Sequence, residues 1–477
     1  MDSTLVGTKR IAGCWIRNSI GINQTKGKRM GRCLNAQSPS RHGTPRNRLF
    51  FNPLPLIRNM RTIYLNAGTM VHFADNDSIN EKQLFSPGKA IIVEGQSIAN
   101  ILDSEEVIQE YTLPEDTSQF QHDEVHVHDL QGQAIVPGLI DGHTHLLWAG
   151  DRSKEVAWRQ EGKSYAQISE MGGGIGHTVS QTRKASTDQL LELGYLRLRD
   201  ALRTGTTHLE AKTGYGLTTE SELRLLEIAA KLNHIEHTPT IESTWMGAHD
   251  IPKEVQREAY IESLHSEQLP AVLEQGLARS VDVFCEPGWF SLEESEDILR
   301  AGRQGGLAMR MHIDEFNDGG GGELAAELGV ETADHAYHTP MKARINMKEA
   351  GVNTGFLPGT PYAMGDSWPD LAPLLEHDIP FTLASDFNPN CYTLSLPFMC
   401  SLMVQRCGLH PLSALAAVTV NAARATQHPS GLVHGQLMEG AVANFNIVDG
   451  QNWESMMLRP SSGPFSGTVL NGHYISQ

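Results

Sequence analysis

The stretch Val136-Pro-Gly-Leu-Ile-Asp-Gly-His143-Thr-His145 decides the fold of this chain. A mainly apolar run ends in two histidines that are separated by one residue. In a strand, residues two positions apart point to the same side, so a strand over residues 134–145 presents both imidazoles together at its carboxyl end. Two neutral imidazoles in this arrangement suit a metal ion such as Zn2+ or Fe2+.

Seven further stretches downstream have a strand-like composition, and helical segments lie between most of them. Together with the first, the expected strands are residues 134–145, 206–212, 240–248, 281–287, 308–315, 332–338, 351–357 and 381–386. Helices are expected over the leucine-rich residues 188–203 and after the capping-box pair Ser291 and Glu294. Eight strand–helix units over about 290 residues are the size of a (β/α)8 barrel.

Short strand-like stretches flank the barrel sequence on both sides. They are residues 62–66, 90–94 and 97–101 before it, and residues 444–448 after it. We expect the two ends of the chain to form one small β-sandwich beside the barrel. The predicted organisation is a basic extension at 1–60, sandwich segments at 61–133 and 429–477, and a metal-dependent barrel at 134–428.

Residues 1–60 differ in composition from the rest of the chain. They hold eleven Lys and Arg residues and one acid, Asp2, in a chain of net charge −18. Three interpretations stay open: a disordered tail, a mitochondrial targeting segment, and non-native translation upstream of Met60. The remainder carries a net charge of about −28, which argues against nucleic acid as a partner because phosphate binding needs a basic face.

The bulk composition is that of a globular protein without a membrane span. Hydrophobic residues make up 40% and charged residues 20% of the chain, and no run of about 18 apolar residues occurs. Six cysteines without a CxxC pattern indicate a reducing compartment rather than a disulfide scaffold. We expect a cytoplasmic protein, or a mitochondrial one if residues 1–60 are a transit segment.

Polar side chains also close three later strands. The fifth expected strand contains His312 and ends in Glu315, the sixth contains His335, and the eighth ends in Asp386. The carboxyl ends of barrel strands meet at one rim, so these groups should join the histidine pair there. The histidines and Asp386 can hold a metal that activates water, while Asp386, Glu315 and His335 are candidates for proton transfer.

A binuclear site is the rival metal arrangement. It commonly uses a bridging carboxylate or a modified lysine on the fourth strand. Here the fourth strand ends at Glu286, and Lys212 lies on the second strand. We therefore expect a single metal ion.

Extended motifs surround these residues. They are His145-Leu-Leu-Trp-Ala-Gly-Asp-Arg152, Gly172-Gly-Gly-Ile175, Glu210-Ala-Lys-Thr-Gly-Tyr215-Gly-Leu, Gly247-Ala-His249, His312-Ile-Asp-Glu315-Phe and Ser385-Asp386-Phe-Asn388-Pro389. In this order they resemble the amidohydrolase superfamily and, within it, the imidazolonepropionase family. The resemblance runs from about Arg61 to the carboxyl terminus and leaves out residues 1–60.

The resemblance implies a (β/α)8 barrel that hydrolyses the cyclic amide of 4-imidazolone-5-propanoate to N-formimidoyl-L-glutamate in histidine degradation. It also implies one Zn2+ or Fe ion per subunit and a homodimer. The implied metal ligands are His143, His145, His312 and Asp386, and the implied substrate contacts are Arg152, Tyr215, His249, Glu315 and Asn388.

The residue types agree with these implied roles. Arg152 offers a planar fork for the propanoate of the substrate, and the loop that carries Tyr215 can bring its hydroxyl over the pocket. Each assignment also has a plainer interpretation: a salt bridge for Arg152, rim packing for Tyr215, a loop cap for His249 and turn formation for Asn388.

The chain departs from the family pattern in two places. Asn390-Cys391 stands where Gly followed by Ser or Thr is common. If the backbone there holds the substrate, we expect the exchange to retune binding without abolishing it. Asn444 replaces an aspartate in the sandwich, far from the chemistry. Two other functions stay open: another ring hydrolase or aminohydrolase of the superfamily, and a non-catalytic barrel. The complete ligand set disfavours the second of these.

Overall fold

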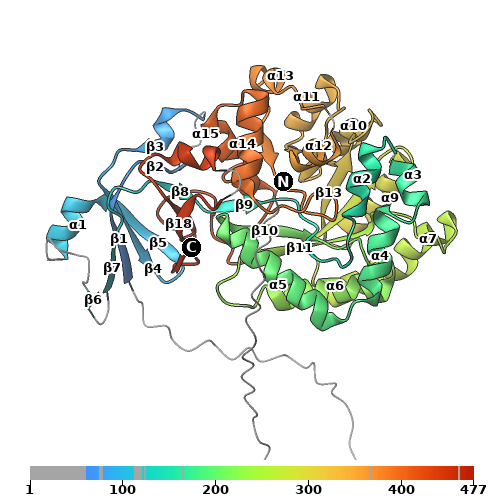
Figure 1. Cartoon of the computed structure of the whole chain (residues 1–477), viewed down its shortest axis with the longest axis horizontal. Helices are drawn as coiled ribbons and strands as arrows, with labels where there is room; N and C mark the ends of the chain where they lie inside the picture. Colours follow the sequence, from blue (N-terminus) through green and yellow to red (C-terminus); the bar gives the residue numbers. More distant parts are fainter. Residues whose placement is uncertain are drawn as a thin grey trace, which may run out of the picture. The chain divides into compact units, whose positions relative to one another are not determined.

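The computed structural model describes residues 61–74, 79–111, 121–122, 125–163, 165–365, 367–459 and 462–477. The extension expected at residues 1–60 lies outside the described residues. Within those ranges, no helix is long and apolar enough to cross a membrane. The chain from residue 61 onward forms an eight-stranded sheet and two smaller sheets (Figure 1).

The eight-stranded sheet is the wall of the barrel. Its strands are β9 (Leu139–Asp141), β10 (Thr206–Lys212), β11 (Thr240–Ala248), β12 (Ser280–Cys285), β13 (Ala308–Ile313), β14 (Thr332–His335), β15 (Asn353–Phe356) and β16 (Phe381–Leu383). They are neighbours in chain order, and each pair is parallel. The expected (β/α)8 barrel is confirmed.

Helices connect successive barrel strands, and two more, α14 and α15, follow the last strand β16 (Figure 1). They are α2 (Lys154–Gln160), α3 (Tyr165–Glu170), α4 (Gly174–Lys184), α5 (Thr187–Arg203), α6 (Thr219–Leu232), α7 (Arg257–Ser263), α8 (Leu269–Gln275), α9 (Leu292–Gln304), α10 (Gly321–Leu328), α11 (Met341–Glu349), α12 (Gly359–Met364), α13 (Ala372–Glu376), α14 (Leu396–Cys407) and α15 (Pro411–Ala417). A π-helical turn, Leu264–Gln268, joins α7 to α8. A 3-10 turn, Ala422–Arg424, follows α15.

Local sequence explains where two of these helices begin. The Ser291 hydroxyl accepts a hydrogen bond from the Glu294 amide, and the Glu294 carboxylate accepts one from the Ser291 amide. This is the predicted capping box of α9. An equivalent box, Ser186 with Gln189, starts α5 at Thr187.

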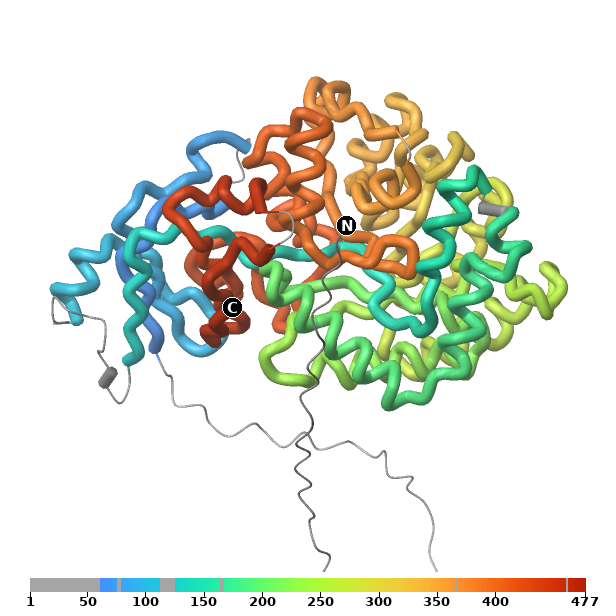
Figure 2. Tube along the Cα trace, viewed as in Figure 1, coloured from blue at the N-terminus to red at the C-terminus, as the bar shows by residue number. Residues whose placement is uncertain are grey.

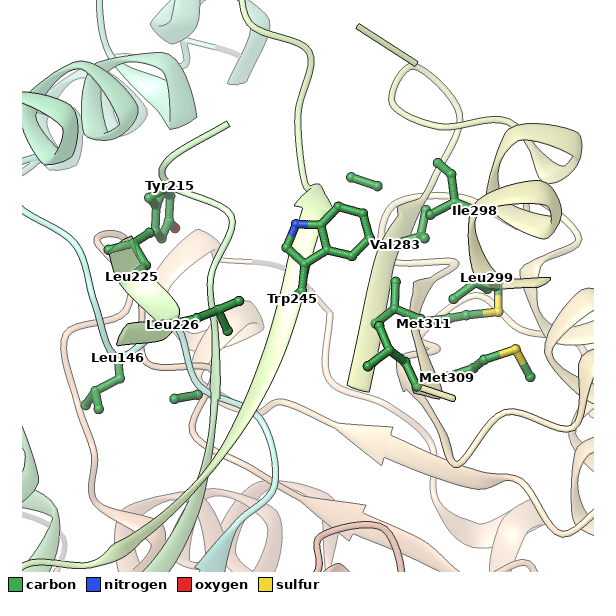
Figure 3. Packing of buried hydrophobic residues seen from close by; sticks show 14 of the residues in the cluster. Leu146, Tyr215, Leu225, Leu226, Trp245, Val283, Ile298, Leu299, Met309 and Met311 are labelled. Carbon is green, nitrogen blue, oxygen red and sulfur yellow. The ribbon is translucent and has the colours of Figure 1, made fainter. Parts of the chain in front are cut away.

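The apolar core lies between the barrel strands and their helices. Figure 3 shows Trp245 of β11 near Val283 of β12, with Met309 and Met311 of β13 beside Leu299 of α9. Because side chains alternate along a strand, Arg310, the residue between these two methionines, faces the other way. It contacts groups across the barrel interior.

The barrel closes beyond the ends of its first and last strands. The Ser385 amide donates to the Asp141 carboxylate at 2.9 Å. The Asp386 amide donates to the His143 carbonyl at 3.1 Å, and the His145 amide donates to the Phe387 carbonyl at 2.9 Å. These bonds join the two segments that carry three of the predicted metal ligands.

The predicted first strand, residues 134–145, was wrong as a single element. It divides into β8 (Ile135–Pro137), which belongs to a different sheet, and β9 of the barrel. Gly138 lies between them because the backbone passes against Thr207 there, where a Cβ atom would lie 2.3 Å from Thr207 Oγ1. His143 and His145 therefore lie in the extended loop after β9.

Five other strands end earlier than predicted, at the rim where the polar groups lie. Asp314, His335 and Asp386 have φ values of 46°, 66° and 48°. A left-handed residue breaks the pleat of a strand, and outside glycine this conformation costs about 1–3 kcal/mol. The strands 281–287, 308–315, 332–338, 351–357 and 381–386 end instead at residues 285, 313, 335, 356 and 383.

The remaining strands build the two sheets of the sandwich. One sheet contains β1 (Arg61–Ala67), β4 (Lys89–Glu94), β5 (Ser97–Asp103), β6 (Gln121–His122) and β7 (Val125–Asp129). The other contains β2 (Met70–Val71), β3 (Leu84–Phe85), β8, β17 (Phe445–Val448), β18 (Phe465–Leu470) and β19 (His473–Ser476). The helix α1 (Ser104–Glu110) and the 3-10 turns Glu81–Gln83 and Trp453–Leu458 complete this part.

Both ends of the chain contribute to the second sheet, as predicted. Strand β8 pairs with β2 on one side and with β17 on the other. In Figure 2 the blue N-terminal and red C-terminal segments run side by side, and the Ile98 amide donates to the Ala441 carbonyl at 2.9 Å. A shared core that includes Tyr64, Ile135 and Phe445 lies between the sheets.

The close passage at Gly138 gives a stability prediction. We expect Gly138→Ala to lower the free energy of unfolding by about 1–3 kcal/mol, because the added methyl overlaps the buried Thr207 side chain. The second change Thr207→Ala should recover most of this loss. Denaturant unfolding measures both, with Gly176→Ala as the control, since its nearest neighbour lies 3.8 Å from the new methyl. A fully stable Gly138→Ala protein would contradict the packing argument.

Candidate metal centre and active site

One pocket at the carboxyl ends of the barrel strands brings together most of the expected site residues. Nine of the ten residues expected at the site line it: His145, Arg152, Tyr215, His249, His312, Glu315, His335, Asp386 and Asn388. The tenth, His143, is 1% exposed, and its ring centroid lies 4.4 Å from that of His312. The structure thus brings together all of the residues that the sequence singled out.

The potential metal ligands form two groups that share His143. One contains His143, His145 and Asp386, and the other contains His143, His312 and His335; within each group the ligand atoms lie within 4.8 Å of one another. Asp386 Oδ1 is 3.7 Å from His143 Nε2 and 3.8 Å from His145 Nε2. The groups together contain the four predicted ligands and His335.

Buried carboxylates orient two of these imidazoles. His143 Nδ1 lies 2.7 Å from Asp334 Oδ2, and His312 Nδ1 lies 2.9 Å from Asp282 Oδ1. The Nε2 atoms of both rings are buried and have no hydrogen-bond partner among the described residues. A carboxylate behind Nδ1 with an open Nε2 is the arrangement of a metal-binding histidine, so these residues fit a metal ion.

Burial also keeps the imidazoles neutral. It holds the pKa of His143, of His145 and of His335 well below the usual value for histidine, and neighbouring cationic groups add to the effect. Burial raises the pKa of Asp386, whose Oδ2 accepts a hydrogen bond from Thr360 at 2.8 Å. Neutral imidazoles keep their lone pairs for a cation.

His335 and Glu315 lie close together at the pocket wall. His335 Nε2 is 3.7 Å from Glu315 Oε2, while His335 Nδ1 has no hydrogen-bond partner among the described residues. The Glu315 amide donates to Glu286 Oε2 at 2.9 Å. Glu286, at the end of the fourth strand, therefore holds the Glu315 loop and belongs to neither group of potential ligands.

Arg152 also lines the pocket, and a carboxylate holds its side chain in place. Its Nε and Nη2 atoms each donate to the Glu155 carboxylate at 2.8 Å. The same carboxylate accepts a hydrogen bond from the Gly174 amide at 2.8 Å, and a Cβ at Gly173 would lie 2.7 Å from it. This contact explains Gly173, while Gly172 and Gly174 have positive φ values of 88° and 71°. The two hydrogen bonds to Glu155 fix the orientation of Arg152.

Tyr215 and His249 are connected through their loops. His249 Nδ1 lies 2.8 Å from the Gly214 carbonyl, so this nitrogen donates and Nε2 remains an acceptor. The His249 ring stacks on His145 at 4.9 Å, and the Tyr215 ring lies 5.1 Å from it. Burial lowers the pKa of His249 to about 3, which keeps this ring neutral.

Asn388 organises the loop after β16. Its Nδ2 donates to the Asp386 carbonyl at 2.8 Å, and its Oδ1 accepts from the Asn390 amide at 2.7 Å. The Cys391 amide donates to the same oxygen at 3.3 Å. Asn390 and Cys391, the two departures from the family pattern, also line the pocket.

Sequence reasoning missed the charged and aromatic surroundings of the site. Lys212, Asp282 and Asp334 are buried behind the histidines. Although burial opposes a charged ammonium, Asp282 and Glu210 raise the pKa of Lys212 above its usual value. The pocket also has an aromatic wall of Phe284, Trp289 and Phe316. The sequence signal that could have identified the buried charges is the occurrence of charged residues within otherwise apolar strands.

Comparisons with known proteins identify the family. No family model matches the chain. It is 39% identical to the imidazolonepropionase of Haloarcula marismortui over 75% of this chain and 83% of that protein. It is 39% identical to that of Symbiobacterium thermophilum over 82% and 92%, and 37% identical to that of Geobacillus thermodenitrificans over 84% and 93%.

Solved structures share the fold at low identity. An adenosine deaminase from Xanthomonas campestris with bound zinc has a TM-score of 0.62 and 14% identity, over 87% of this chain and 92% of that one. The ochratoxinase of A. niger has a TM-score of 0.62 and 17% identity, over 88% and 96%. The sequence likeness to curated relatives, together with this barrel, shows that the chain belongs to the imidazolonepropionase family of the amidohydrolase superfamily.

Proposed function

We propose that this protein hydrolyses 4-imidazolone-5-propanoate to N-formimidoyl-L-glutamate, a step of histidine degradation. Water oxygen adds to the ring carbonyl carbon, the ring C–N bond breaks, and the departing nitrogen takes a proton. The observation that carries the proposal is the convergence of nine of the ten expected site residues on one pocket, in a chain 39% identical to imidazolonepropionases.

The proposed cofactor is one Zn2+ or Fe ion per subunit. His143, His145, His312 and Asp386 would hold it, because two of these imidazoles have buried Nε2 atoms without partners among the described residues. When bound, the metal lowers the pKa of a water molecule so that hydroxide forms near neutral pH. His335, which shares a group with His143 and His312, could hold the same ion or orient the water.

The protein side chains then handle protons and position the substrate. Glu315 lines the pocket within 3.7 Å of His335 and would pass protons to the ring nitrogen, and Asp386 would serve both as a metal ligand and as a proton acceptor. Arg152 would bind the propanoate with its planar fork. Tyr215, His249 and Asn388 would contact the imidazolone ring from their loops.

The proposed setting is the cytoplasm, with the enzyme as a homodimer. The four cysteines in the described residues, Cys285, Cys391, Cys400 and Cys407, are free thiols.

A direct turnover assay tests the proposal. Purified protein is given freshly prepared imidazolone propanoate, with and without a chelator, and the product is identified by mass. Chelator-sensitive formation of formimidoylglutamate is the expected result. Intact imidazolone with a metal-loaded protein would overturn the substrate assignment, and release of ammonia from purine or pyrimidine rings would then favour an aminohydrolase.

The carboxylate-binding role of Arg152 gives a separate prediction. We expect Arg152→Ala to raise KM about 10- to 100-fold, since a hydrogen-bonded charge contributes about 1.5–3 kcal/mol, with the metal content unchanged. Steady-state kinetics measure this, and the exposed Arg199→Ala protein is the control. An unchanged KM would remove Arg152 from the carboxylate-binding role.

A further inference from the structure

A buried ammonium group lies between two strands behind the metal-binding histidines. Lys212 of β10 is 1% exposed, and its Nζ lies 2.9 Å from Glu210 Oε1 and 2.6 Å from Asp282 Oδ2. All three charged side chains are completely buried. The Lys212 ammonium therefore pairs with both carboxylates in the buried interior of the barrel. There, a charge without a partner would lower the stability of the fold.

The first branch from Lys212 leads to His312. Asp282 binds Lys212 through Oδ2, and its other oxygen, Oδ1, lies 2.9 Å from His312 Nδ1. The Lys212 ammonium thus holds the Asp282 carboxylate in place, and this carboxylate in turn orients the His312 imidazole. Without the cation, Asp282 would be free to rotate, and His312 would lose the acceptor that directs its Nε2 toward the metal.

The second branch leads to the loop that carries His143 and His145. Glu210 Oε2 accepts a hydrogen bond from the Thr144 amide at 3.3 Å, and the Thr144 hydroxyl donates to the Glu210 carbonyl at 2.7 Å. The Lys212 amide donates to the Thr144 carbonyl at 2.9 Å. Because Thr144 stands between the two histidines, β10 sets the position of both.

We propose that Lys212 is a positioning residue that holds His312 through Asp282 and the His143–His145 loop through Glu210. This inference rests on the proposed metal-dependent function. It makes the affinity for the metal, rather than the binding of substrate, depend on a side chain that belongs to neither ligand group. A purely structural ion pair would instead affect folding stability and leave the metal affinity of the folded protein unchanged.

The test is a competition between the protein and a chromophoric chelator for Zn2+. We expect Lys212→Met to weaken zinc binding about 10- to 100-fold, the usual effect of losing a group that supports a metal ligand. At saturating zinc, KM should equal that of the wild type. The control is Glu242→Gln, which breaks the equally buried ion pair with Arg310 at 2.7 Å and leaves the Lys212 contacts intact.

A second variant keeps the test decisive if Lys212→Met does not fold. Asp282→Asn preserves the shape of the side chain and should weaken zinc binding by a similar factor. If Lys212 acts through Asp282, the double variant should lose less affinity than the product of the two single losses. Wild-type zinc affinity in either folded variant overturns the proposal.

Failure of this inference can be distinguished from failure of the proposed function. Zinc affinity is measured without substrate, so the result tests the role of Lys212 even if the protein turns over no imidazolone. Loss of affinity equal to that of Glu242→Gln would mean that any broken ion pair in the barrel has the same effect, and the specific role of Lys212 would be rejected.

Discussion

Replacing His143 by alanine should remove both the metal and nearly all turnover. His143 is the one residue common to both groups of potential ligands, and its Nδ1 is already positioned by Asp334 at 2.7 Å. The variant would keep the pocket but lose the imidazole that connects Asp386 with His312. Metal content by atomic emission, measured together with the rate of imidazolone loss, tests this result.

The matched control is His434→Ala. His434 is 5% exposed, comparably buried, and its Nε2 lies 2.7 Å from the Thr426 carbonyl. It belongs to neither ligand group found in the described part of the chain. This variant should retain metal and turnover. Normal metal content and full activity in His143→Ala would reject the metal centre as assigned.

Replacing Glu315 by glutamine should separate chemistry from metal binding. The amide keeps the size of the carboxylate but cannot take up a proton, so kcat should fall about 10²- to 10⁴-fold, the range of general acid–base catalysis. The loop should stay in place, because the Glu286 carboxylate holds the backbone amide of residue 315 at 2.9 Å. Metal content should remain that of the wild type.

Rapid-quench kinetics and metal analysis measure the two effects separately. The exposed Glu323→Gln, on the helix that follows, is the control and should behave as wild type. Unchanged kcat would remove Glu315 from proton transfer. Loss of metal together with turnover would instead assign Glu315 to the support of the metal centre.

The sequence was sufficient to predict the barrel, but not the ends of its strands. The eight apolar runs lie where the strands lie, because burial on both faces requires such runs in a parallel sheet. The carboxyl ends of the fifth and sixth strands were placed too late because Asp314 and His335 leave the pleat in left-handed conformations, and Asp386 adopts one three residues after the end of β16. These conformations depend on tertiary contacts, such as that of Asp386 with Thr360.

The candidate site was predictable to the extent that its residues occur in motifs. Contacts between the side chains of the site were not predictable, since nothing in a linear sequence places Asp282 against His312 or Lys212 against Glu210. The same limit applies to Glu155, which is 2% exposed and binds Arg152. Residues 1–60 lie outside the described residues, and the interpretations of them stay predictions.

The division of the first strand at Gly138 has a consequence for how the protein folds. Strand β8 pairs with β17, and their partners Ile135 and Ile447 are about 300 residues apart in the chain. Contacts of such high sequence separation close slowly. During synthesis, the edge of β8 that pairs with β17 therefore stays unpaired until residues 445–448 have left the ribosome. Such an exposed edge is a site for aggregation or chaperone binding.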